Sequence, residues 1–173
     1  MLDLLLDNEP TVRLSVFLGV FALIAIWEAA SPRRERGYSR WLRWTSNLGI
    51  VAVNTVVIRL LFPIAAVGMA VATADSGWGL LNIIDLPVWL EILIAVVLLD
   101  MVIYLQHVMV HAVPVLWRLH RMHHADLDYD VTTGARFHPI EIILSMAIKL
   151  ATVSVLGASP AAVIIFEVLL NAT

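Results

Sequence analysis

Histidines gather in one short segment of the chain, and their spacing is that of metal ligands. Five of the six histidines form the patterns His107-x-x-x-His111 and His120-x-x-His123-His124. Residues three and four apart share one face of an α-helix, with Cβ atoms about 5–6 Å apart. Imidazole is a common metal ligand, and zinc, copper, iron and nickel all accept it. The pattern therefore predicts a metal site without choosing the metal.

Other polar side chains are candidates to support such a site. Asp100 and Tyr104 precede His107 at steps of four and three, on one stripe of an expected helix. Because ligating imidazoles usually donate their second N–H to a neighbouring group, Asp100, Tyr104 or Glu141 could orient a histidine. For Asp100, a hydrogen bond between helices is an equally good interpretation. His138 is either a further metal ligand or a loop residue that forms a hydrogen bond.

Two other metal motifs are incomplete in this sequence. A hydrolytic zinc site of the H-E-x-x-H type needs a glutamate after its first histidine, but residues 108–110 are Val-Met-Val. Asp126, Asp128 and Asp130 alternate like calcium ligands, yet the glycine and later glutamate of an EF-hand loop are missing. We interpret these aspartates as part of a solvated connection.

Composition places these residues in a membrane protein. The chain has 173 residues, is 61% hydrophobic and has a mean hydropathy of +0.89, whereas soluble domains are about 45–50% apolar. Its net charge of -3, with basic residues that form no continuous face, argues against a nucleic-acid partner. Because cysteine is absent, any metal must be held by nitrogen or oxygen atoms.

Three apolar segments approach the roughly 20 residues that cross a bilayer. They are about Leu14–Ala30, Asn47–Ala72 and Trp89–His111. The first is expected to be an anchor and not a cleaved signal peptide, because arginines follow it. Pro63 is expected to kink the second span without breaking it, and Arg59 near its end is interpreted as structural.

The connecting segments indicate an orientation. Residues 32–46 carry arginines with Trp41 and Trp44, a mixture typical of the cytoplasmic interface. Thr73–Pro87 contains no lysine or arginine, which is typical of an outside loop. The histidines are therefore expected at the cytoplasmic edge of an integral membrane protein. The arginines of the first connection are Arg33, Arg34, Arg36, Arg40 and Arg43.

After the third span, Pro114 is expected to end or bend the helix, and Val115–Met122 to lie near the membrane surface. Two further apolar segments, Ile140–Leu156 and Ala161–Ala172, flank a break at Gly157–Pro160. The last segment has twelve residues, too few for a span. We expect this pair to dip into the membrane as a hairpin, unless the chain ends inside a helix.

The predicted fold class is all-α, a polytopic membrane helical bundle with three clear transmembrane helices and a C-terminal apolar helical pair. No internal repeat or soluble domain boundary interrupts the chain, so residues 1–173 are expected to form a single membrane domain. Its N-terminal transmembrane helices are expected within residues 12–72.

Over about its last 80 residues, 89–173, the chain resembles the fatty acid hydroxylase / sterol desaturase superfamily of integral membrane, non-haem di-iron enzymes. Both histidine boxes contribute to the resemblance, together with Asp100 and two later segments. The quoted segments are Trp117–His124, Asp130-Val131-Thr132-Thr133 and Arg136-Phe137-His138-Pro139-Ile140-Glu141.

The resemblance implies that the five clustered histidines are iron ligands in a two-iron centre. It also implies a lipid substrate, fatty acyl or sterol-like, that is hydroxylated or desaturated in lipid biosynthesis. Oxygen and an external electron donor, a reductase or a cytochrome- or ferredoxin-type protein, would complete the reaction. Family members continue into further histidine boxes, so we expect a carboxyl-terminal truncation here and, as a consequence, poor metal binding and no activity of this chain alone.

Two other function classes stay open at this stage. A membrane zinc hydrolase would need zinc, a carboxylate base and no oxygen. A non-catalytic membrane scaffold or metal-binding protein would need no turnover. Metal content separates these classes from an oxygenase.

Overall fold

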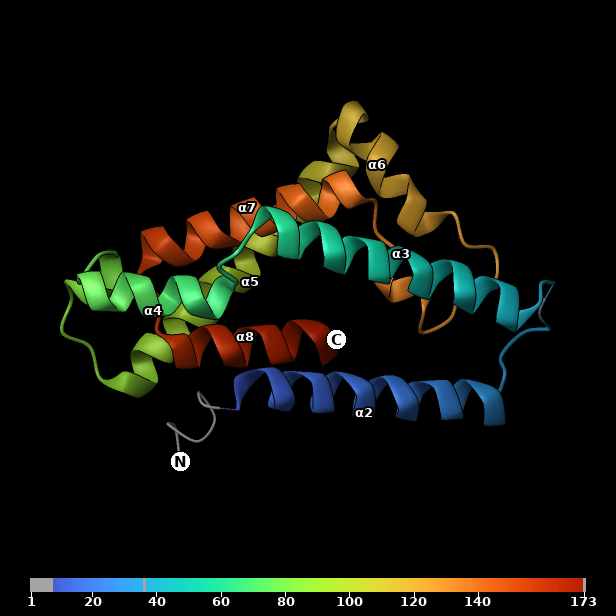
Figure 1. The fold of residues 1–173 in the computed structure, drawn as a ribbon, viewed down its shortest axis with the longest axis horizontal. Helices are drawn as coiled ribbons and strands as arrows, with labels where there is room; N and C mark the ends of the chain where they lie inside the picture. The colour runs from blue at the N-terminus through green and yellow to red at the C-terminus, as the bar shows by residue number, and fades with distance from the viewer. Residues whose placement is uncertain (1–7, 36, 173) are drawn as a thin grey trace. The chain divides into compact units, whose positions relative to one another are not determined.

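The computed structural model describes residues 8–35 and 37–172, and these residues are helical with no strand. Arg36, one of the arginines of the first connection, lies outside the described residues. The α-helices are joined by loops and two short 3-10 turns, η1 (Leu80–Asn82) and η2 (Thr133–Ala135). Figure 1 shows α2 (Glu9–Ala30), α3 (Arg40–Leu61), α4 (Ala66–Ser76), α5 (Val88–Ala112), α6 (Pro114–His124), α7 (Pro139–Leu156) and α8 (Pro160–Ala172).

Four segments of the described chain are long and apolar enough to cross a membrane. They are Pro10–Ala30, Arg40–Ser76, Val88–Ala112 and Pro139–Leu156, whereas Pro160–Asn171 is shorter. The protein is thus a polytopic helical membrane bundle, as predicted. The helix Pro139–Leu156 is a fourth candidate span, where the sequence indicated one half of a short helical pair.

The second predicted span differs from the structure at both ends and in the middle. Its helix begins at Arg40, inside the segment that was expected to be a loop. Pro63 breaks the helix and does not merely kink it, since α3 ends at Leu61 and α4 starts at Ala66. Proline lacks an N–H group and disfavours a helical conformation in the residue before it, which explains the break.

Residues group into two compact units by their contacts. The first unit contains residues 8–18, 64–106 and 147–172, and the second, which we call the histidine unit, contains residues 19–63 and 107–146. The single domain predicted from the sequence stays a prediction.

In the first unit, α4 packs against α8. Ala66 and Ala70 of α4 and Ala162 and Phe166 of α8 are almost completely buried. Small residues at such an interface let two helix backbones approach closely, which replaces the missing hydrophobic driving force inside a bilayer. The C-terminal helix is therefore an integral part of this unit.

Two glycines allow loops of the first unit to meet. Gly79 and Gly157 have positive φ angles of 105° and 67°. A Cβ atom added to Gly79 would lie 2.3 Å from the Cα atom of Gly157. Both positions require glycine, because a side chain would clash and the backbone is in a region that other residues avoid.

The first unit also buries charge. Glu167 is 3% exposed, and its carboxylate lies 2.8 Å from Nη1 of Arg13 and 3.0 Å from Nζ of Lys149. Glu91 of α5 accepts hydrogen bonds from the backbone N–H and the hydroxyl group of Ser159, which precedes α8. These pairs link helices α2, α5, α7 and α8 within the unit.

In the histidine unit, α3 contributes a buried polar stripe. Arg43, Asn47 and Asn54 lie on one side of α3 and are at most 9% exposed. All three bind the segment between α6 and α7, where Asn54 donates a hydrogen bond to the carbonyl oxygen of Phe137 at 2.9 Å. This segment joins the second histidine box to Glu141, so α3 fixes the frame in which those residues lie.

Candidate metal centre

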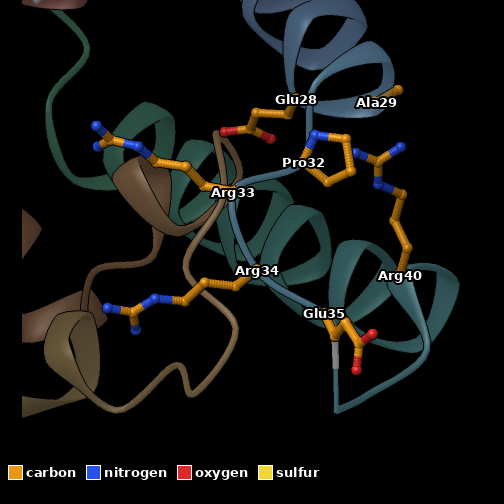
Figure 2. A pocket seen from close by; sticks show the side chains of 7 residues that line it. All are labelled: Glu28, Ala29, Pro32, Arg33, Arg34, Glu35 and Arg40. Carbon is orange, nitrogen blue, oxygen red and sulfur yellow. The ribbon is translucent and has the colours of Figure 1, made fainter.

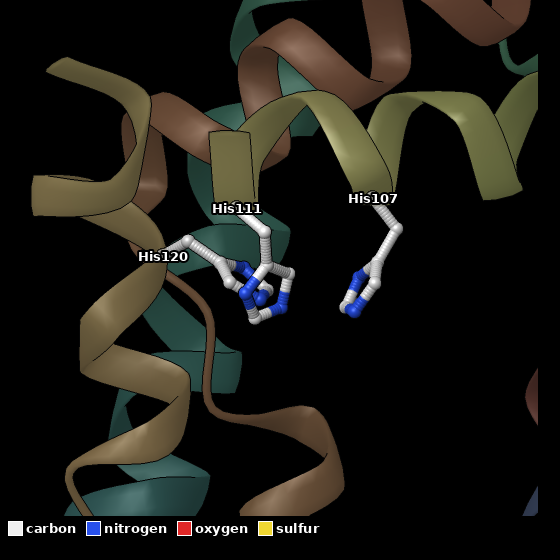
Figure 3. A group of neighbouring side chains, drawn as sticks. All are labelled: His107, His111 and His120. Carbon is white, nitrogen blue, oxygen red and sulfur yellow. The ribbon is translucent and has the colours of Figure 1, made fainter. Parts of the chain in front are cut away.

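Three histidines from two helices converge in the histidine unit. His107 and His111 come from the last turns of α5, and His120 comes from α6 (Figure 3). One ring nitrogen of each lies within 4.8 Å of the others. Pro114 occupies the first turn of α6, where its missing N–H costs nothing, and this sharp restart turns the second box toward the first.

His120 is the buried member of this group. It is 0% exposed, while His107 and His111 are exposed. Nδ1 of His120 lies 2.6 Å from Oε1 of Glu141 on α7. A carboxylate can only accept a hydrogen bond, so this contact places the proton on Nδ1 and leaves a lone pair on Nε2. That is the form of imidazole that binds a metal.

His124 adds a fourth nitrogen. Its Nε2 atom lies 3.2 Å from Nε2 of His120, and its ring centroid lies 5.0 Å from that of His111. Because His120 presents a lone pair on this side, either a proton on His124 or a cation must separate the two nitrogens. The four rings of His107, His111, His120 and His124 form what we call the histidine cluster.

His123 has a different environment. Its ring is stacked on Phe137 at 4.6 Å with an interplanar angle of 5°, and its Nε2 atom lies 3.5 Å from the hydroxyl oxygen of Tyr129. Its centroid is still 5.0 Å from that of His124. His123 therefore contacts the segment after α6 as well as the histidine cluster.

Two imidazoles of α6, buried His120 and half-buried His123, are held in their neutral form. Burial, with the neighbouring His111 and His124, lowers the pKa of His120 to about 4. Burial, followed by His124 and His120, lowers the pKa of His123 to about 4. Both are neutral at pH 7, as metal ligands must be.

The other sequence candidates have separate positions. Asp100 and Tyr104 are exposed residues of α5 that belong to the first unit, so their support of the histidines stays a prediction. His138 lies at the start of α7, where its Nδ1 atom accepts a hydrogen bond from the backbone N–H of Ile140 at 3.2 Å. This is the loop hydrogen bond that the sequence offered as the alternative to a metal ligand.

Sequence reasoning missed the residues that hold the connection between α6 and α7. Arg43 donates to both oxygens of Asp126, at 2.8 and 2.7 Å, and to Oδ2 of Asp130 at 2.8 Å. Thr133 donates to Asp126, and Thr132 donates to Asp130. We call these five residues the arginine clamp. The expectation of a solvated loop is wrong for Asp126 and Asp130, because both carboxylates are buried and form ion pairs with Arg43.

Asp128 is also engaged. Its carboxylate accepts hydrogen bonds from the backbone N–H groups of Gly37 and Tyr38, at 3.2 and 2.7 Å.

The hydrogen bond with Arg43 holds the pKa of Asp126 well below its usual range, so this carboxylate is ionised at any physiological pH. All three aspartates therefore bind protein groups, which argues against a calcium site formed by them.

Hollows open on the described part of the histidine unit. One, of about 470 Å³, lies between the end of α2 and the start of α3, and it mixes arginines with Glu28 and Glu35 (Figure 2). The other, of about 720 Å³, is lined by residues of α6 with His138 and includes His124 of the histidine cluster.

The family model described as "Fatty acid hydroxylase" matches residues 92–173. This part of the chain is therefore similar to the fatty acid hydroxylase family. The matched segment includes the histidine cluster, Glu141 and the arginine clamp's loop residues, and the family is one of lipid hydroxylases and desaturases with iron-dependent catalysis. No curated protein and no solved structure matches the chain.

Proposed function

We propose that this protein is a membrane-bound, O2-dependent non-haem iron oxidoreductase that hydroxylates or desaturates a C–H bond of a lipid. The observation that carries the proposal is the contact of Glu141 with buried His120. It prepares one nitrogen of a histidine cluster to bind a metal, inside the segment that matches the fatty acid hydroxylase family.

The donor set fits iron. His107, His111 and His120 offer nitrogens within 4.8 Å of one another, and exposed His107 and His111 have room for small adjustments of their side chains. Oε2 of Glu141 is buried without a hydrogen-bond partner among the described residues, so the carboxylate has spare capacity for a charged group. Neutral imidazoles bound to iron leave net positive charge, which a nearby carboxylate balances.

When bound by this cluster, iron would supply the oxidation of an unactivated C–H bond by O2. In hydroxylation, O2, two electrons and two protons convert C–H to C–OH and release one water. In desaturation the same reactants remove two hydrogens from adjacent carbons and release two waters. The electrons come from an external reductase or a cytochrome- or ferredoxin-type protein.

The chain's own residues would bind the metal and orient its ligands. Glu141 fixes the tautomer and the ring direction of His120, and α5 and α6 bring the two boxes together. The arginine clamp holds the connection that carries Phe137 and leads into Glu141. We further propose that His123 would serve a second iron and that the cluster faces the cytoplasm.

Metal analysis and lipid analysis test this proposal together. Protein purified in detergent would be incubated anaerobically with Fe(II) or Zn(II), desalted and analysed for bound metal, beside the variant His120→Ala. The resemblance alone implied poor metal binding, but three histidine nitrogens already converge in this chain, so we expect the wild type to retain iron and the variant to lose it. Lipids extracted from membranes that hold the protein would be searched for products 16 Da heavier or 2 Da lighter.

The competing classes give different results. Retention of zinc with hydrolysed lipids in the absence of O2 would indicate a hydrolase. A protein that retains neither metal and changes no lipid would indicate a scaffold. Either result would make the oxidoreductase proposal wrong.

A further inference from the structure

The larger hollow beside the histidine cluster has an unusual charge balance. Arg118 and Arg121 line it, and no carboxylate does. Both arginines are exposed, and they lie three residues apart on one face of α6. The hollow therefore presents two guanidinium groups without an anionic partner of its own.

The aspartates that follow α6 do not neutralise these arginines. Asp126 and Asp130 bind Arg43, and Asp128 binds the backbone N–H groups of residues 37 and 38. No ion pair of Arg118 or Arg121 occurs within residues 8–35 and 37–172. Two positive charges are thus available to a ligand.

The hollow reaches the histidine cluster along an apolar wall. Trp117 lies on this wall, with its ring 5.2 Å from that of His111 and 5.6 Å from that of His124. Met122 adds a flexible apolar side chain to the same lining. A ligand whose charged end contacts the arginines could therefore lay its apolar part toward the cluster.

Size and position favour a small amphiphile. About 720 Å³ lies within the range of pockets for small molecules, which is about 300–1,000 Å³. α6 directly follows the candidate span α5, and arginine and tryptophan are typical of the level of lipid headgroups. A protein partner would need a broad face of about 800 Å², not a hollow.

We propose that Arg118 and Arg121 form a recognition site for the anionic headgroup of an amphiphilic lipid whose chain extends toward the histidine cluster. The planar guanidinium fork matches both carboxylate and phosphate, so a free fatty acid and a phosphorylated lipid share this chemistry. That the bound lipid is the substrate rests on the proposed function, whereas the binding itself does not.

The other hollow supplies a control. Arg33, Arg34 and Arg40 line it, but Glu28 and Glu35 share that lining and offset their charge (Figure 2). No histidine of the cluster lines this hollow. An exposed arginine there, Arg34, tests whether any arginine near a detergent micelle attracts anionic lipid.

The experiment measures binding of three probes to metal-free protein in maltoside detergent: oleate, oleoyl lysophosphatidate and methyl oleate, which carries no charge. We expect the wild type to bind at least one anionic probe about tenfold more tightly than methyl oleate. The double variant Arg118→Gln/Arg121→Gln should lose that preference, and Arg34→Gln should keep it. A double lysine variant at residues 118 and 121 should show an intermediate preference, because it keeps charge but loses the fork.

The two anionic probes identify the source of the headgroup. Preference for oleate indicates a carboxylate, and preference for lysophosphatidate indicates a phosphate. Equal binding of all three probes by the wild type, or unchanged preference in the double glutamine variant, would overturn the proposal. So would charge-dependent binding of an acidic ferredoxin at these arginines with no preference for either lipid.

Iron content is measured separately on the same variants. Loss of lipid preference with unchanged iron retention is expected for Arg118→Gln/Arg121→Gln. If the wild type retains no iron but still prefers anionic lipid, the proposed oxidoreductase function fails and the headgroup site stands. If iron is retained and no preference is seen, only the headgroup site fails.

Discussion

Nδ1 of His120 lies 2.6 Å from Oε1 of Glu141, and both side chains are buried although they come from different helices. The contact makes Glu141 the orienting partner of the least exposed imidazole in the histidine cluster. Carboxylate partners of this kind typically contribute a factor of about 10–100 to metal affinity. The pair therefore predicts a measurable loss when only its charge is removed.

Glu141→Gln should weaken Co(II) binding about tenfold, because glutamine fills the same space without stabilising the imidazole as strongly. Visible absorption of bound Co(II), followed during titration, measures the affinity. Glu35→Gln, at an exposed position of the other hollow, is the matched control. Equal affinities of the Glu141 variant and the wild type would show that this contact does not support metal binding.

His124 and His123 are adjacent, yet the structure distinguishes them. His124 faces Nε2 of His120, whereas His123 is stacked on Phe137. We therefore expect His124→Ala to weaken Co(II) binding more than His123→Ala, by about tenfold between the two. Titration of both variants checks this order, and the reverse order would favour His123 as the closer ligand.

Local patterns made the spans and the cluster predictable. Apolar runs near 20 residues define helices in a bilayer with little help from neighbours. The spacings 107/111 and 120/124 place imidazoles on one helix face in any fold, so their convergence needed only a turn between the helices, which Pro114 begins. Glu141 was named beside Asp100 as a possible supporting carboxylate; it lies 2.6 Å from His120, and its role at a metal stays a prediction.

Long-range pairing was not predictable from one sequence. Arg43 and Asp126 are 83 residues apart. When the partner of a charged residue is unknown, that residue is predicted to be exposed to solvent. For the same reason, the start of α3 at Arg40 was not predicted, because several arginines close together are typical of an interfacial loop. Whether Pro63 kinks or breaks a helix depends on neighbouring groups that the sequence does not specify.

The arginine clamp should be essential for stability. Arg43→Ala leaves Asp126 and Asp130 buried without a counter-charge, and removal of one partner from a buried ion pair typically costs about 3–5 kcal/mol. Arg43→Lys should recover only part of this, because lysine cannot donate to two carboxylates in the fork geometry. Melting temperature in detergent and protease cleavage between residues 126 and 137 report the effect.

Arg34→Ala is the control for the clamp, since this arginine is exposed. It should leave melting and cleavage near wild-type values. If Arg43→Ala melts with the control and shows no new cleavage, the clamp contributes little and α3 does not hold the connection.

The contact of the two glycines in the first unit predicts an asymmetry between glycine substitutions. Gly157→Ala should destabilise by about 2 kcal/mol, because its φ is 67° and its Cβ would lie 2.9 Å from the carbonyl oxygen of Trp78. Gly19→Ala, inside α2 with nothing within 4 Å of a Cβ, should be neutral or stabilising by up to about 1 kcal/mol. Thermal unfolding monitored by tryptophan fluorescence compares them, and a Gly157 variant as stable as the Gly19 variant would contradict the close approach.

The ion pairs of Glu167 predict which of its members contributes most to stability. Glu167 pairs with both Arg13 and Lys149, so Glu167→Gln leaves the largely buried ammonium group of Lys149 without its carboxylate. Lys149→Met leaves the pair of Arg13 with Glu167 intact and replaces the ammonium group by an apolar one of similar length. A buried charge without any partner destabilises a protein more than the loss of one of two partners does. Glu167→Gln should therefore lower the melting temperature by several degrees, and Lys149→Met by much less.

The double variant Lys149→Met/Glu167→Gln completes a thermodynamic cycle. It should be more stable than Glu167→Gln alone, since removal of Lys149 eliminates the ammonium group that Glu167→Gln leaves unpaired. Melting temperatures of all four proteins in the same detergent measure this coupling. Additive losses would mean that Lys149 and Glu167 do not depend on each other, and the ion pair would then contribute nothing to holding α7 and α8 together.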